Sequence, residues 1–256
     1  MPVTGWLNAL STYLQQSMLF RPTRLGADYT FKFSQPFDEI FLDTPDGVRL
    51  NLLHFFTEKK VRRGVVLFFH GNRYNLQHWG KKYQDFTSRG YDFVALEYRG
   101  YGKSSGAPDE NLYYQDALQV YEWLRETYPA EQIVLYGASL GTGIAAYLAA
   151  QVPAKLVLLE TPYDSIAGLT ASLIGLSSLP FPPAFKFPND WHLAQSTLPI
   201  LIFHGTADRV VPYKSAARLK TVLKPGDEFV TIPGGRHSNL RDFDLYQERL
   251  GKWLEG

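Results

Sequence analysis

The chain has 256 residues, of which 45% are hydrophobic, so it can bury one large core. Its 26 basic and 25 acidic residues nearly cancel, and no basic run stands out, which argues against a nucleic-acid-binding groove. It contains no cysteine, which excludes disulfides, thiolate metal sites and a cysteine nucleophile.

The sequence predicts in which compartment the protein is located and how its N-terminal segment is placed. No apolar run reaches the roughly 18 residues of a membrane span, and no secretory signal is evident, so we expect a cytoplasmic protein. Residues 1–25 carry a helical apolar stripe of Val3, Leu7, Leu10 and Leu14, which predicts a helical extension docked on the body. Peripheral membrane contact through 1–25 is less favoured, because the segment's basic residues are only Arg21 and Arg24.

From about residue 37, short apolar runs alternate with helical patterns. Strands are predicted at 37–43, 48–56, 64–70, 91–98, 132–136, 155–160, 200–204 and 228–232. Helices are predicted near 76–89, 110–128, 141–151, 213–223 and 242–254. This alternation indicates the α/β class, with a mostly parallel, doubly wound sheet of about eight strands that opens with an antiparallel hairpin.

We expect one domain over residues 1–256. One segment, 161–197, is too long for a single crossover helix between one strand and the next. It holds an apolar stretch over 166–179 and then Pro180-Phe181-Pro182-Pro183. This composition predicts a small cap over the carboxyl edge of the sheet, and a crossover helix followed by a surface loop is the alternative.

The sequence Gly137-Ala138-Ser139-Leu140-Gly141 follows a strand-like run and precedes a helical one. A serine at the apex of such a strand–turn–helix unit has a strained backbone, and its hydroxyl stands clear of the sheet. The flanking glycines let the helix pass close to the strand. Ser139 is therefore a candidate nucleophile, which needs a base to take its proton.

Two later loops can supply the partners of this serine. Asp208 follows the strand at 200–204, and His237 follows a Gly-Gly turn after the strand at 228–232. Histidine is the usual base, and a carboxylate holds its ring in one tautomer. Because the carboxyl ends of parallel strands meet at one edge, we predict Ser139, Asp208 and His237 as the catalytic residues. Taken singly, a turn role for Asp208 and a solvated loop position for His237 are the alternatives.

The loop Phe69-His70-Gly71-Asn72 is the third element of the predicted site. Acyl transfer creates a negative oxygen, and we expect the backbone N–H groups of Asn72 and Leu140 to stabilise it. His70 and His204 are interpreted as structural. An apolar acyl pocket is predicted from Tyr74, Trp79, Leu173, Phe181, Phe185 and Val210, with packing inside the cap as the alternative.

These segments resemble the α/β-hydrolase superfamily, in particular its single-domain serine hydrolases with a His-Gly-Asn oxyanion loop. The motifs that carry the resemblance are FFHGN (68–72), EYRGYGKSSG (97–106), GASLG (137–141), ETPYDS (160–165), HGTADRVVP (204–212) and GGRHSNL (234–240). The resemblance implies the α/β-hydrolase fold, with Ser139 as nucleophile, Asp208 as acid and His237 as base.

The predicted function is that of a serine hydrolase that cleaves carboxylic esters or thioesters through an acyl-Ser139 intermediate. The expected partner is a small ester or acyl compound, with no cofactor and no metal. Two alternatives stay open. A serine aminopeptidase would need a carboxylate for the substrate ammonium, and Glu160 and Asp164 are candidates. A non-catalytic protein would use the pocket only to bind a small molecule.

Overall fold

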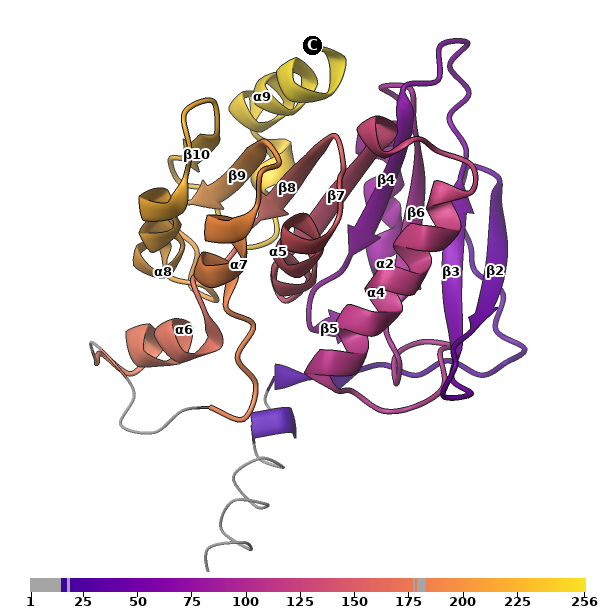
Figure 1. Ribbon diagram of the computed structural model, residues 1–256, viewed down its shortest axis with the longest axis horizontal. Coiled ribbons are helices and arrows are strands. Elements are labelled where there is room, and N and C mark those ends of the chain that lie inside the picture. Colours follow the sequence, from indigo (N-terminus) through magenta and orange to yellow (C-terminus); the bar gives the residue numbers. More distant parts are fainter. Residues whose placement is uncertain (1–14, 18, 177, 179–182) are drawn as a thin grey trace, which may run out of the picture.

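The computed structural model describes residues 15–17, 19–176, 178 and 183–256. Its centre is an eight-stranded sheet of order β10-β9-β8-β7-β4-β6-β3-β2 (Figure 1). The strands are β2 (Phe37–Asp43), β3 (Arg49–Phe55), β4 (Gly64–Phe69), β6 (Tyr91–Glu97), β7 (Ile133–Ala138), β8 (Leu156–Glu160), β9 (Ile200–Gly205) and β10 (Glu228–Ile232). The β2–β3 and β3–β6 pairs are antiparallel and the others are parallel, which confirms the predicted mostly parallel sheet.

Helices cover both faces of this sheet, because its central strands are apolar on both sides. One face packs against α4 (Glu110–Arg125), α5 (Gly141–Gln151) and α7 (Asn189–Gln195). The other packs against α2 (Leu76–Trp79), α3 (Tyr83–Thr87) and α9 (Asp244–Glu255). Side chains of β7 alternate between the two cores, with Leu135 in the first and Tyr136 in the second.

Two predicted helices are interrupted. The pattern at 76–89 forms α2, a 3-10 turn at Gly80–Lys82 and then α3. Gly80, where the 3-10 turn begins, lies against the ring of Phe33, and a Cβ atom there would come within 2.7 Å of Cζ. The pattern at 213–223 likewise splits into α8 (Tyr213–Ala217) and a 3-10 helix at Arg218–Val222.

The N-terminal segment joins the body at the edge that carries the predicted site. Residues 1–14 lie outside the described part, and 15–17 and 19 are helical. The next residues form β1 (Arg21–Pro22), which pairs in parallel with β5 (Arg73–Tyr74). The segment predicted as a cap contributes α6 (Ile166–Leu173) and α7. Among the described helices, none has both the length and the apolar character needed to cross a membrane.

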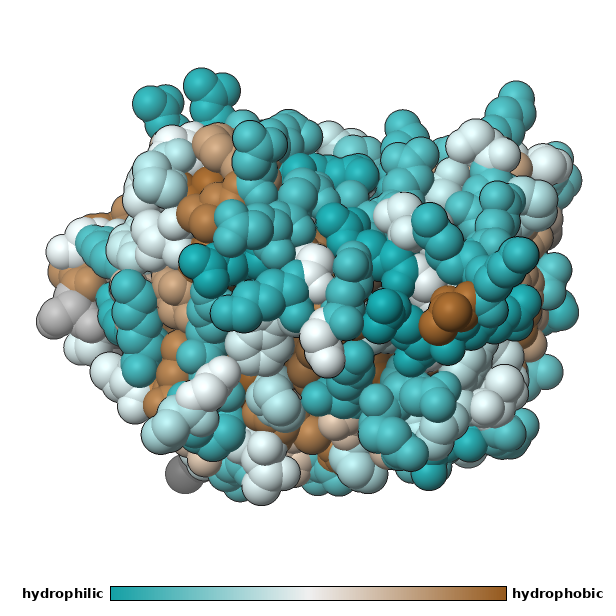
Figure 2. Space-filling model, turned by 90° about the horizontal axis from the view of Figure 1, so that it is seen from above, coloured by the Kyte–Doolittle hydropathy of each residue, from teal (hydrophilic) through white to brown (hydrophobic). Residues whose placement is uncertain are grey.

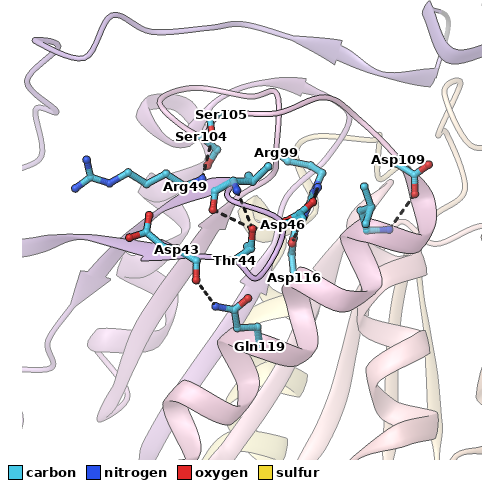
Figure 3. Close-up of polar contacts among 12 residues, drawn as sticks. Asp43, Thr44, Asp46, Arg49, Arg99, Ser104, Ser105, Asp109, Asp116 and Gln119 are labelled. Atoms are coloured by element: carbon cyan, nitrogen blue, oxygen red, sulfur yellow. Dashed lines mark hydrogen bonds and ion pairs between the residues drawn. The ribbon is translucent and has the colours of Figure 1, made fainter.

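A buried ion cluster joins the β2–β3 turn to the loop after β6 and to α4 (Figure 3). The guanidinium of Arg99 donates to both carboxylate oxygens of Asp116, at 2.7 Å from Nε and 2.5 Å from Nη2. Its Nη1 donates to Asp46 at 2.8 Å. Hydrogen bonds from Arg99 and, second, from Thr44 lower the pKa of Asp46 to about 2. Arg99 therefore fastens the antiparallel hairpin to the parallel part of the sheet.

Candidate active site

Ser139 stands between β7 and α5 with φ at 51°, a conformation that side chains other than glycine rarely adopt. Its amide donates to the carbonyl of Glu160 at 2.9 Å. Its own carbonyl accepts from Thr142 Oγ1 at 2.6 Å and from the Thr142 amide at 3.0 Å. These bonds hold the strained backbone in place, as the strand–turn–helix pattern requires.

The glycines on either side of Ser139 are needed for close approach. A Cβ atom at Gly137 would lie 2.4 Å from the carbonyl oxygen of Gly141, and one at Gly141 would lie 2.1 Å from that of Phe69. Both contacts are with backbone, which cannot move aside cheaply. The helix after the turn therefore passes against β7 and β4 only because these positions lack side chains.

The three predicted catalytic side chains meet at the carboxyl edge of the sheet. Ser139 Oγ lies 3.0 Å from Nε2 of His237, and Nδ1 of His237 donates to Oδ2 of Asp208 at 2.7 Å. Both separations are within the range in which protons are exchanged. Ser139 is 9% exposed and the His237 side chain 21%, so both residues keep some contact with solvent.

Asp208 is buried and held as a carboxylate. Its Oδ1 accepts from the amides of Val210 and Val211 at 2.8 and 2.9 Å. Burial raises the pKa of Asp208, but its hydrogen bonds to His237 and to these two amides outweigh burial, so the pKa is lowered overall. Asp208 is thus charged at neutral pH and fixes the Nδ1–H tautomer of the histidine.

The two predicted oxyanion donors lie on loops that meet at Ser139. Gly71 lies against Ser139, with the position of its missing Cβ 3.5 Å from Ser139 Cβ. The carbonyl of the next residue, Asn72, accepts from Arg21 and Tyr101, each at 3.0 Å. Within the described part of the chain no hydrogen bond occupies the amide N–H of Asn72 or of Leu140. Neither amide is therefore bonded to a protein acceptor among the described residues.

The two other histidines at strand ends, His70 and His204, have structural surroundings. His70 is fully buried; its Nδ1 donates to the Gly71 carbonyl at 2.7 Å, and its Nε2 lies 3.1 Å from Glu97. His204 Nε2 contacts the carbonyl of Val211 at 3.0 Å, and burial lowers the pKa of this ring. Each supports a loop beside the triad, which matches the interpretation made from the sequence.

Sequence reasoning missed a second layer of contacts behind the serine. Asn189, at the start of α7, donates through Nδ2 to Thr142 Oγ1 at 3.0 Å and to the carbonyl of Tyr163 at 2.9 Å. Thr142 in turn binds the Ser139 carbonyl, so the segment after β8 braces the turn. Only the position of Thr142, three residues after Ser139, could have signalled this role, because Asn189 is remote in sequence.

The residues predicted to line a pocket are placed in different settings. Trp79 lies against Gly71 and donates from its indole to the Arg73 carbonyl at 2.7 Å, beside the oxyanion loop. Phe185 is buried edge-on against Phe20 at 4.9 Å, so it packs in a core. Phe181 lies outside the described residues. The remaining predicted lining residues are exposed on the surface: Tyr74, Leu173 and Val210.

Known proteins resemble this chain in sequence. Residues 64–181 match the family described as alpha/beta hydrolase fold. The lysophosphatidylserine lipase ABHD12 of Macaca fascicularis is 29% identical over 185 residues, which are 64% of this chain and 46% of that protein. The Danio rerio protein of the same name is 29% identical over 238 residues, 78% of this chain and 60% of its own length. The chain thus spans about half the length of the curated relatives it matches.

Solved structures share the fold. The esterase Pf2001 of Pyrococcus furiosus superposes with a TM-score of 0.72 at 19% identity, covering 93% of this chain and 97% of its own. Est1E of Butyrivibrio proteoclasticus, solved with ferulic acid bound, gives 0.69 at 20% identity, covering 84% and 98%. The sheet order, the turn at Ser139 and these likenesses together establish that this chain has the α/β-hydrolase fold.

Proposed function

We propose that this chain hydrolyses carboxylic esters or thioesters through an acyl intermediate on Ser139. The observation that carries the proposal is the contact series from Asp208 to His237 to Ser139, at 2.7 and 3.0 Å. A strained serine, an oriented imidazole and two unoccupied amide donors are the parts that acyl transfer requires.

In the proposed reaction, Nε2 of His237 takes the Ser139 proton as Oγ attacks the carbonyl carbon of the substrate. The amides of Leu140 and Asn72 bind the oxygen that becomes negative. His237 then gives the proton to the departing alcohol or thiol, which leaves the acyl group on Ser139. Water repeats the sequence, releases the carboxylic acid and restores the serine.

Ester cleavage is favoured over removal of N-terminal residues, because the two carboxylates considered for a substrate ammonium are already paired. Glu160 accepts from Lys82 Nζ at 2.6 Å and from the hydroxyls of Tyr136 and Tyr246. Burial raises the pKa of Glu160, but Lys82 outweighs it and the pKa is lowered overall.

The second carboxylate is paired in the same way. Asp164 accepts from Arg218 at 2.6 Å and from Ser215 at 2.5 Å. A substrate ammonium would have to displace a cation from either group. The relatives named as lipases and esterases also support an ester substrate for this chain.

The proposal is tested with Ser139→Ala, p-nitrophenyl esters of increasing acyl length and a fluorophosphonate probe. We expect ester turnover to fall by about 10⁴-fold or more and covalent labelling to disappear. The matched control is Ser88→Ala, at an exposed serine that follows α3, and it should keep both ester turnover and covalent labelling. Unchanged turnover in Ser139→Ala would contradict the proposal, and an unlabelled wild-type protein would favour the binding-only alternative.

A further measurement separates the two substrate classes. Aminoacyl arylamides are expected to turn over more slowly than esters, and the reverse order would favour the aminopeptidase alternative.

A further inference from the structure

Large hydrophobic side chains are exposed mainly on the edge of the molecule that carries the candidate site. In the described part of the chain seven are exposed, and five of them lie here, each 48–59% exposed: Tyr74, Leu173, Ile174, Leu176 and Val210. We call these five residues the rim patch. In Figure 1, α6 and β5 lie along the lower edge, toward which β8 and β9 point.

The rim patch adjoins the candidate site on two sides. Tyr74 follows the oxyanion loop by two residues and is 50% exposed. Val210 donates its amide to Asp208 and is 55% exposed, so the acid loop carries an exposed apolar residue. The three α6-side residues come from the segment that leaves the carboxyl end of β8.

Unpaired arginines accompany these apolar side chains. Arg21 and Arg73 are register partners in the β1–β5 ladder, Arg209 lies between Asp208 and Val210, and Arg236 precedes His237. All four are exposed, and none forms an ion pair within the part of the chain that the structure describes. Exposed aliphatic groups beside unpaired cations are the combination that binds anionic membrane surfaces.

We infer that the rim patch docks on an anionic lipid surface. Its apolar side chains would enter the boundary between head groups and acyl chains, and the arginines would contact lipid phosphates. A second copy of the chain fits less well, because a two-fold interface through this edge would bring arginines against arginines. The inference does not depend on the proposed function, since docking needs no turnover.

At the opposite end of the molecule the described residues form no comparable apolar patch beside unpaired cations. Figure 2 looks onto that end, and its surface is largely hydrophilic, with hydrophobic residues in small separate groups. The loop between β3 and β4 offers a matched comparison, because it carries Val61, 69% exposed, next to the exposed cations Lys60 and Arg62. Charge and one apolar side chain are present there, but no apolar patch.

The test is co-sedimentation of the full-length Ser139→Ala protein with phosphatidylcholine vesicles that contain or lack phosphatidylserine. We expect sedimentation only with the anionic vesicles. Arg73→Glu should weaken binding about fivefold or more, and the double variant Ile174→Ser with Leu176→Ser about tenfold. Val61→Ser and Lys60→Glu are the matched controls and should bind as the parent does. Thermal unfolding of each variant verifies that it is folded.

Three outcomes would overturn the inference. The first is no sedimentation with phosphatidylserine vesicles. The second is binding that survives the rim-patch variants or falls equally in the Val61 and Lys60 controls. The third is dimerisation in light scattering that Ile174→Ser abolishes while vesicle binding is absent, which would assign the rim patch to a second copy.

Discussion

Asp208 and Arg99 are buried charged groups on the same edge of the sheet, yet their surroundings differ in one respect. Arg99 lies between two carboxylates, and its cluster ends there. Asp208 also has a full set of partners, but its hydrogen bonds continue through His237 to the hydroxyl of Ser139. A buried charge alone therefore does not indicate a catalytic site. A chain of hydrogen bonds that leads from it to a nucleophile does.

The largest expected effect is a loss of ester turnover on substitution of Asp208, which distinguishes the Asp208 contacts from the Arg99 cluster. Asp208→Asn should lower ester turnover by about 10⁴-fold, because an amide leaves His237 in the wrong tautomer. The free energy of unfolding should fall by only about 1–2 kcal/mol, since the amide still fills the buried space. Turnover and denaturant unfolding of the same preparation measure both. Turnover within tenfold of wild type would remove Asp208 from the proposed mechanism.

The Arg99 cluster should show the reverse pattern. Asp116→Ala leaves a guanidinium that is 3% exposed without its bidentate partner, and we expect the free energy of unfolding to fall by about 3–5 kcal/mol. Ester turnover of the folded fraction should stay near wild type. Asp46→Ala removes the partner on the surface side and is the matched control, with a smaller loss of stability. Equal losses of unfolding free energy in Asp116→Ala and Asp46→Ala would contradict the idea that the buried Asp116 contributes more than the exposed Asp46.

The sequence predicted the parts of this edge that depend on local pattern. The strands β2 and β10 have the bounds that were predicted, because each concentrates strand-favouring side chains such as Phe, Ile, Val and Thr between turn residues. The order of Ser139, Asp208 and His237 along strand ends was also readable, since parallel strands bring those ends together.

Contacts between distant segments could not be read in this way. Nothing near Gly80 predicts that the Phe33 ring packs against it where α2 ends. The pairing of Lys82 with Glu160 joins residues 78 positions apart, and nothing in the sequence around Lys82 indicates this partner. Whether Phe185 faces a pocket or a core was likewise undecidable, because the answer depends on Phe20 of the N-terminal segment.

A third kind of buried group, one with no partner, sharpens the comparison. His192 of α7 is buried among aromatic rings, and neither ring nitrogen has a hydrogen bond within the described residues. Burial lowers the pKa of His192 to about 4, from about 6.5 in an unfolded chain. The unfolded state therefore binds the proton first, and His192's contribution to stability is lost as the pH falls from about 6.5 toward 4.

We expect this loss to reach about 2 kcal/mol at pH 4, after allowance for partial solvent screening. The check is denaturant unfolding of wild type and His192→Leu between pH 7 and 4. The difference in stability between the two proteins should shift in favour of the leucine variant as the pH falls. A difference that stays constant over this range would show that His192 titrates alike in both states.

The smallest expected effect concerns the brace behind Ser139. Thr142→Val removes the hydroxyl that binds the Ser139 carbonyl at 2.6 Å and leaves the Asn189 amide without an acceptor there. A net hydrogen bond of about 1 kcal/mol corresponds to about a fivefold fall in kcat, with KM little changed, because the turn loses position rather than substrate contact. Thr142→Ser restores the hydroxyl and should recover kcat. Thr221→Val, which removes an exposed hydroxyl bond to the Arg218 carbonyl, is the matched control. If Thr142→Val lowered the free energy of unfolding but left kcat unchanged, the contacts of Thr142 and Asn189 would have only a structural role, as the Arg99 cluster does.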